Sequence, residues 1–177
     1  SPVSCGILDV NNGTIDFGTN APSSFVAING QTNGIIKLAA DNFPNGNAEN
    51  FASSTGGTVV YYGSGYNLTT QRTFNNVDIN LDASANTLTL LANYTLNGNL
   101  NIKRGIFRIN NDTQTSILTL DVAKDVTVES SGQIRVGLGN TIGTYSISGG
   151  NIPTVGQYHS INHQLRVGGS LTNKGTI

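Results

Sequence analysis

Three tyrosines lie close together in the chain and could take part in ligand binding. Tyr61 and Tyr62 belong to the phrase GTVVYYGSG, residues 57–65, and Tyr66 follows it directly. Aromatic rings can stack on sugar rings while their hydroxyls form hydrogen bonds. In an extended strand Tyr61 and Tyr62 point to opposite faces. The three tyrosines are therefore candidates for a glycan-stacking surface; the alternative is that they fill or cap an interior.

Two histidines, His159 and His163, are four positions apart in the phrase HSINH. That spacing suits a metal ion only on a helix, because in a strand the two side chains would lie about 13 Å apart. No Glu follows His159, as the zinc-protease motif requires. Cys5 is the single cysteine, so no internal disulfide and no cysteine-rich zinc site can form. We expect no metal and no cofactor.

Acidic residues could support polysaccharide cleavage, the chemistry of many β-helix enzymes. Such cleavage needs carboxylates grouped within roughly 5 to 10 Å. Asp121, Asp125 and Glu129 form the only sequence cluster, and Asp121 is expected to face solvent beside Lys124. The chain has no Gly-x-Ser-x-Gly nucleophile motif and no phosphate-binding loop. We assign no catalytic residue and predict a protein that is not an enzyme.

The composition excludes several classes of protein. Charged residues make up 11% of the chain and the net charge is −1, with nine scattered basic residues, so a nucleic-acid-binding surface is not expected. No run of 18 apolar residues predicts a transmembrane segment. The 22 glycines and 24 asparagines favour many tight turns, and no helical periodicity is sustained. We predict an all-β fold.

The stretch Leu88–Ile109 shows the kind of secondary structure that would position the candidate side chains. Its apolar residues occur in short alternating pairs, such as Leu88 and Leu90, separated by turns rich in Asn and Gly. Alternation of this kind is typical of strands. Strands so short cannot bury a face alone, but parallel stacking on similar strands pairs their backbones and gives a continuous core. The pattern predicts a parallel β-helix, or β-solenoid; a β-sandwich is the alternative.

A glycine followed two residues later by an apolar residue marks the repeat. The pairs are Gly13/Ile15, Gly105/Phe107, Gly132/Ile134 and Gly175/Ile177. In the last copy Asn173 replaces an apolar residue, and the segment 141–156 is expected to be an insertion. At roughly 20 residues per coil we expect about nine coils in a rod ~40 Å long. The outward positions are expected to include Thr89, Asn101, Arg108, Arg135 and Arg166.

The N-terminal part is less regular. The phrase GILDVNNGTIDFG, residues 6–18, is interpreted as strand, turn and strand, and Asn29-Gly30 as a second turn. Residues 41–57 are interpreted as a long loop protruding from one face. We therefore divide the chain into an N-terminal β segment, residues 1–56, and a solenoid repeat region, residues 57–177, which is expected to continue into further repeats.

The phrases GTVVYYGSG, TLTLLANYTLNGNLNIKRGIFRIN and LRVGGSLTNKGTI resemble repeats of very large secreted and cell-surface proteins of the Bacteroidetes. The likeness covers residues 57–177. Those proteins are long adhesins and extracellular appendages, exported by the type IX pathway and in some cases serving gliding motility. The resemblance implies a structural or adhesive module at the outer cell surface.

The expected function is therefore mechanical: length, rigidity and a repeated contact surface in an extracellular filament. The expected partners are neighbouring repeats or identical subunits joined end to end, with surface glycans or another cell as further candidates. The alternative function is a glycan-binding or polysaccharide-degrading β-helix domain.

Overall fold

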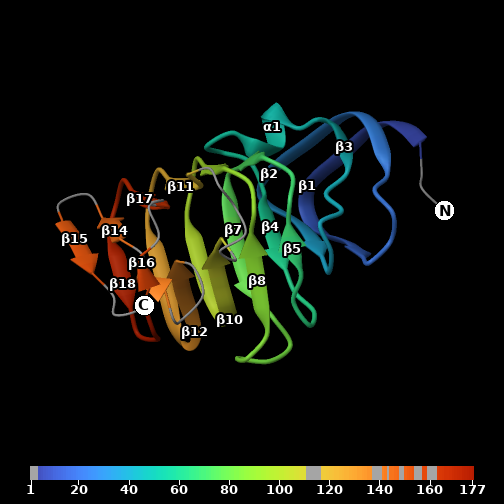
Figure 1. Ribbon diagram of the computed structural model, residues 1–177. Helices are drawn as coiled ribbons and strands as arrows, with labels where there is room; N and C mark the ends of the chain where they lie inside the picture. Colours follow the sequence, from blue (N-terminus) through green and yellow to red (C-terminus); the bar gives the residue numbers. More distant parts are fainter. Residues whose placement is uncertain are drawn as a thin grey trace.

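The protein is a parallel β-solenoid. The computed structural model describes residues 4–110, 117–136, 141–142, 144–147, 150–153, 157–158 and 163–177. Strands follow one another along the solenoid axis in chain order (Figure 1). Nearly all described strand pairs are parallel; the exception is β14 with β15. The all-β prediction and the solenoid are confirmed, and the β-sandwich is excluded.

One face of the solenoid is a continuous parallel sheet. Its strand order is β1-β2-β4-β7-β10-β12-β18. The strands are β1 (Ser4–Gly18), β2 (Ser24–Leu38), β4 (Thr58–Tyr61), β7 (Asn76–Asn80), β10 (Leu100–Ile109), β12 (Val126–Val136) and β18 (Leu171–Asn173). We call it the main sheet. It crosses the expected boundary near residue 57 without a gap, because β2 pairs directly with β4.

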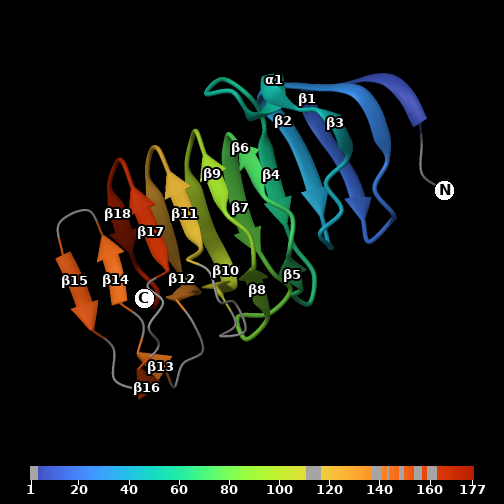
Figure 2. The same cartoon turned by 45° about the horizontal axis from the view of Figure 1, so that its top comes forward.

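Two further rows of strands close the coils. A four-stranded sheet, in the order β17-β11-β9-β6, lies across the interior from the main sheet (Figure 2). Its strands are β6 (Arg72–Phe74), β9 (Tyr94–Leu96), β11 (Thr119–Val122) and β17 (Gln164–Val167). The third row joins β5 (Asn67–Leu68), β8 (Thr87–Leu90) and the second half of β10.

The core consists of columns of apolar side chains that run parallel to the axis. One column follows the main sheet and contains Ile15, Ile36, Val59, Val77, Leu100, Val126 and Leu171. Its five central members are buried, whereas Ile15 and Leu171 at its two ends are only half-buried. Each coil thus buries the apolar face of the next, and the two end coils remain partly uncovered.

An aromatic chain fills the N-terminal part of the core. The ring of Phe43 lies 6.0 Å from that of Phe51 and 4.8 Å from that of Phe74. The ring of Phe74 in turn lies 5.9 Å from Tyr94, in an edge-on arrangement that aromatic pairs prefer. These contacts bring together side chains from segments that are up to 51 positions apart in the chain.

The segment 41–57 is not the protruding loop that we expected. It contains β3 (Asn45–Asn47), which pairs with β2, and the short helix α1 (Glu49–Ala52). The side chain of Phe51 is fully buried and packs against Gly30 of β2 and against Gly57, which directly precedes β4. A Cβ atom at Gly30 or Gly57 would overlap the ring of Phe51. Gly30 therefore lies within β2 to make room for Phe51, and the interpretation of Asn29-Gly30 as a turn is wrong.

The predicted turn at residues 11–13 is also wrong. β1 runs without interruption from Ser4 to Gly18, and a register shift between Val10 and Asn12 takes the place of the turn. Gly13 has a φ of 108°, which L-amino acids with side chains rarely adopt, so the glycine provides the bend at this irregularity.

The glycine alignment of the sequence is correct for its last three members. Gly105 pairs in register with Gly132, and a Cβ at Gly175 would overlap the Gly132 carbonyl, so the three glycines lie above one another. Gly13 belongs to a different column, because its partner in register is Gly34.

Hydrogen bonds between side chains and backbone connect successive coils at one corner. Asn76 Oδ1 accepts from the amide of Asn99, at 2.9 Å. Asn99 Oδ1 accepts from the amide of Asp125, at 3.1 Å, and Asp125 Oδ1 accepts from the amide of Ser170, at 2.7 Å. We call Asn76, Asn99 and Asp125 the corner ladder. It explains part of the high asparagine content, which we had attributed to turns alone.

The solenoid makes about five turns, fewer than the nine expected. Partners on neighbouring strands of the main sheet are close to the assumed spacing, from 18 positions for Val59 and Val77 to 26 for Leu100 and Val126, except at the last step, where Ser170 bonds to Asp125 from 45 residues further along the chain. The predicted insertion at 141–156 contributes β13 (Thr141–Ile142), β14 (Thr144–Ile147) and β15 (Gly150–Pro153). β13 pairs with β16 (Gln157–Tyr158).

The predicted outward positions are correct with one exception. Asn101, Arg108 and Arg135 are partly exposed and Arg166 is exposed, but Thr89 is buried. No helix in the described part of the chain has the length and apolar character needed to cross a membrane.

Candidate functional site

Two of the three candidate tyrosines are packing residues. Tyr61 is 1% exposed, and its hydroxyl lies 3.3 Å from that of Tyr94 inside the core. Tyr66 donates a hydrogen bond of 2.9 Å to the carbonyl of Leu38. Burial raises the pKa of Tyr61, Tyr66 and Tyr94 above the usual value for a phenol, because a buried phenolate would be poorly solvated. Tyr61 therefore belongs to the core, whereas Tyr66 packs against the core and is partly exposed.

Tyr62, on the opposite face of the strand, is tied to two neighbouring coils. Its hydroxyl donates a hydrogen bond of 2.9 Å to Asp16, and Lys37 lies 4.7 Å above its ring. Lys37 also forms an ion pair with Asp16, at 3.5 Å. One face of the ring is therefore in contact with a cation, and the side chain as a whole is partly exposed.

The three clustered acids are separated by the fold. Asp121 lies on β11, where its neighbour in register is Arg166 rather than Lys124. Asp125 belongs to the corner ladder, and Glu129 forms an ion pair of 3.4 Å with Lys174. The Asp125 and Glu129 carboxylates are thus engaged in contacts between coils, and the structure offers no reason to group the three as a catalytic set.

His163 has a structural environment. It is buried, and its Nδ1 accepts a hydrogen bond of 3.0 Å from the amide of Leu118. Its Nε2 lies 2.6 Å from Nδ2 of Asn110. His159 lies outside the described residues. Within the described ranges, no group of three or more His, Cys, Asp or Glu side chains is placed to hold a metal ion.

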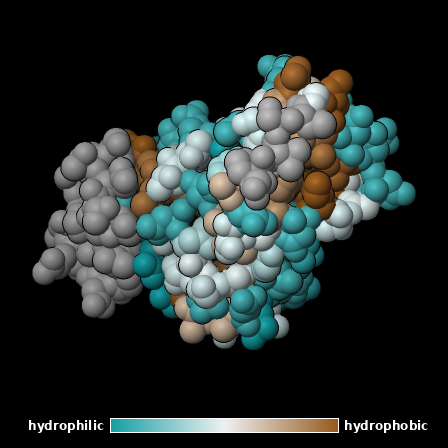
Figure 3. Space-filling view, turned by 90° about the vertical axis from the view of Figure 1, so that its right-hand side faces the viewer, coloured by the Kyte–Doolittle hydropathy of each residue, from teal (hydrophilic) through white to brown (hydrophobic). Residues whose placement is uncertain are grey.

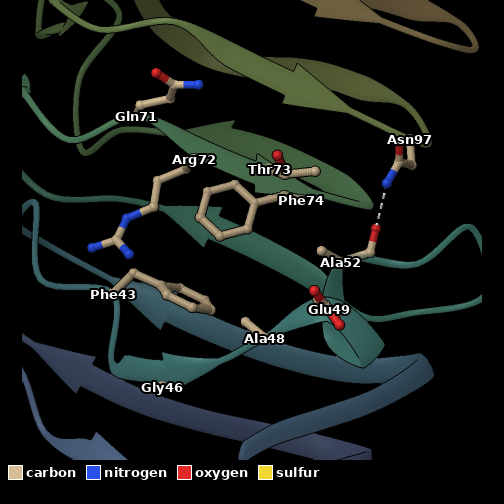
Figure 4. A pocket seen from close by; sticks show the side chains of 10 residues that line it. All are labelled: Phe43, Gly46, Ala48, Glu49, Ala52, Gln71, Arg72, Thr73, Phe74 and Asn97. Carbon is tan, nitrogen blue, oxygen red and sulfur yellow. Dashed lines mark hydrogen bonds between the residues drawn. The ribbon is translucent and has the colours of Figure 1, made fainter.

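A hollow of about 390 Å³ lies between α1 and β6 and was not anticipated from the sequence. Its apolar lining comes from Phe43, Phe74, Ala48 and Ala52. Arg72 and Glu49 lie at different sides of it, with Thr73 on β6 and Gln71 directly before that strand (Figure 4). Asn97 closes one end by donating a hydrogen bond of 2.8 Å to the carbonyl of Ala52. We call this hollow the Arg72 pocket.

A second hollow, of about 650 Å³, lies over the bends of β1 and β2. Its lining is polar and includes Asp9, Asn11, Asn29, Gln31 and Asn50. Several of these groups already bond within the protein: Asn29 donates to Asp9 at 2.8 Å, and Asn50 Oδ1 accepts from the amide of Gly30 at 3.0 Å. We interpret it as a solvated corner of the fold.

The two ends of the solenoid expose apolar side chains. At the N-terminal end, Ile7 on β1 is 58% exposed and Val26 on β2 is 74% exposed. Figure 3 looks onto this end and shows apolar surface gathered on its upper part. At the other end Ile177 is 41% exposed. Within the described chain, β1 and β18 are also the terminal strands of the main sheet.

The comparisons with known proteins add no relative: no protein family, curated protein or solved structure matches the chain. The functional interpretation therefore depends on the geometry described above. One sequence feature is consistent with the Arg72 pocket. Arg72 and Phe74 are alternate residues, so in a strand their side chains share a face.

Proposed function

We propose that the chain is a structural and adhesive module of a long extracellular filament on a bacterial cell surface, and that it is not an enzyme. The module supplies length and rigidity, and its coils continue end to end into neighbouring repeats or identical subunits. A surface fibre of the type exported by the type IX pathway, including those used in gliding, is the setting that the sequence resemblance favours.

The observation that carries the proposal is the apolar column of the main sheet. Its central residues are fully covered by the coils above and below, but Ile15 and Leu171 at its ends are covered on one side only. A further coil at either end would bury these side chains and gain about 25 cal/mol for each Å² of apolar surface removed from water. The same coil would pair the free backbone groups of the terminal strand.

The direction of association follows from the parallel sheet. Among the described residues, β1 and β18 each have an edge without a partner strand at opposite ends of one sheet, so contact between these edges joins copies head to tail. Head-to-tail contacts are not self-complementary, and they produce an open filament unless rotation closes a ring. A filament that extends along the solenoid axis is consistent with a mechanical role.

Small-angle X-ray scattering of the 177-residue chain tests this proposal. As concentration rises, we expect the cross-sectional radius to stay constant while the length and mass increase together. Growth in cross-section instead of length would mean that copies associate through their sides and would contradict the proposal.

A further inference from the structure

Arg72 occupies a position that the other coils fill with apolar side chains. In register, Arg72 pairs with Tyr94, Tyr94 with Leu120, and Leu120 with Leu165. The three partners are buried in the core. An arginine at the start of this column is costly unless its charge is used, because a partly desolvated guanidinium requires hydrogen-bond acceptors.

The described residues supply no acceptor for one of these donors. Nε of Arg72 is buried and has no hydrogen-bond partner in the part of the chain that the structure describes. None of the three ion pairs found among the described residues includes Arg72. Its Cζ atom lies 5.5 Å from the centre of the Phe43 ring, a cation-π contact that holds the side chain without satisfying its N–H groups. Buried donors left without partners call for an explanation, such as a bound ligand.

We propose that the Arg72 pocket binds a sugar that carries a carboxylate, such as a uronic acid residue of an acidic polysaccharide. The planar guanidinium of Arg72 matches a carboxylate with two parallel N–H···O bonds. The pocket volume of about 390 Å³ lies within the usual range of small-molecule sites.

The rest of the lining favours a sugar over a simple anion. Phe43 and Phe74 are almost fully buried and form a closed apolar wall, the partly exposed Ala48 offers apolar surface for C–H groups, and the exposed residues Gln71 and Thr73 lie at the rim. Glu49, also in the lining, can accept hydrogen bonds from sugar hydroxyls. One uronic acid unit, with its carboxylate and its hydroxyls, offers a partner to both charged residues.

This binding site does not depend on the proposed filament, since its lining lies between α1 and β6 rather than at either terminal strand. Isothermal titration calorimetry with trigalacturonate, compared with neutral galactotriose, tests it. We expect the protein to bind trigalacturonate and not galactotriose, with affinity that falls as salt is added.

Arg72→Gln should weaken binding by at least about tenfold, because a charge-assisted bidentate contact is lost. Arg72→Lys keeps the charge but not the planar fork and should also bind more weakly. Arg104→Gln makes the same change at an exposed position of β10 and should bind as the unaltered protein does. Melting temperatures check that each variant is folded. If Arg72→Gln does not fold, Arg72→Lys still tests the role of the guanidinium.

Two results would overturn the proposal. One is the absence of trigalacturonate binding by the unaltered protein; the other is equal binding by the unaltered protein and a folded Arg72 variant. Equal affinity for galactotriose and trigalacturonate would exclude the assigned role of the carboxylate. If the protein binds trigalacturonate but does not grow in length with concentration, the proposed filament is refuted and the binding site is not.

Discussion

The hydroxyl of Tyr62 donates a hydrogen bond of 2.9 Å to the carboxylate of Asp16, which lies 46 positions earlier and two strands away in the main sheet. Lys37, on the strand between them, contacts both residues. The side chains thus link three successive coils on the outer face of the main sheet. A tyrosine that the sequence marked as a candidate sugar platform is used for contact between coils.

This contact predicts a measurable pKa difference. Burial pushes the pKa of Asp16 upward, but hydrogen bonds from the Gly18 amide and the Tyr62 hydroxyl outweigh it and, with Lys37 nearby, hold the pKa below 3.8. In Tyr62→Phe the pKa of Asp16 should rise toward 3.8, as followed by NMR titration of the carboxyl carbon. Because the folded-state pKa is depressed, this stabilisation exists above pH 3.8 and is lost as the pH falls through the folded-state value. An unchanged Asp16 titration in Tyr62→Phe would show that the hydrogen bond is absent in solution.

The buried tyrosines predict loss of stability at alkaline pH. Burial raises the folded-state pKa of Tyr61, Tyr66 and Tyr94 above 10.0, so the unfolded state loses these protons first as the pH rises. Stability should be complete below pH 10 and decline above it. Absorbance at 295 nm and circular dichroism should show part of the phenolate signal appearing only as the strands unfold. If every phenol titrates before the dichroism changes, the aromatic core is more open than described.

The corner ladder predicts that selected asparagines stabilise the fold. Asn76→Ala removes the acceptor of the Asn99 amide and should lower the free energy of unfolding by about 1 kcal/mol. Asn80→Ala is the matched control, because Asn80 is exposed and lies on the same strand. Urea denaturation of both variants provides the measurement. Equal stability of the two variants would mean that water replaces the ladder at no cost.

The contact between Gly30 and Phe51 predicts strong non-additivity. Gly30→Ala should cost about 1–3 kcal/mol through overlap with the ring, and Phe51→Ala about 3–5 kcal/mol through a cavity. In the double variant the alanine at position 30 should cost much less than it does alone, because the ring is gone. Gly6→Ala, which meets no atom within 4 Å, is the control. Additive effects in thermal or urea unfolding would contradict the described packing.

Period-two alternation was sufficient to predict the solenoid, because it reports which strand face is buried. Ile36, Val59 and Leu100 lie on the buried faces of their strands, but their alignment in one column depends on the register between coils. The same alternation predicted that Tyr61 and Tyr62 would separate, one inward and one outward, and this is confirmed.

Local sequence patterns gave wrong predictions at positions whose structure depends on contacts with distant segments. Asn29-Gly30 has the composition of a turn, but its glycine is needed by Phe51, which arrives from a later segment. Thr89 alternates as an outward residue and is nevertheless buried. The Arg72 pocket requires Phe43 and Glu49 to lie beside β6, and no short-range pattern places them there. Contacts of this kind depend on the register between coils, which residue composition does not specify.

Sedimentation velocity over a wide range of protein concentration tests the central claim, that coils join end to end, most directly. The unaltered chain should form larger species as concentration rises. A variant with Ile7→Lys and Ile15→Lys should remain a monomer, because both side chains lie on β1, the terminal strand of the main sheet among the described residues, and lysines on an edge strand oppose its pairing with another copy. Ile117→Lys, at a side chain that is 53% exposed away from the ends, should associate like the unaltered chain. A monomer at every concentration, or association that survives the Ile7 and Ile15 changes, would contradict the account.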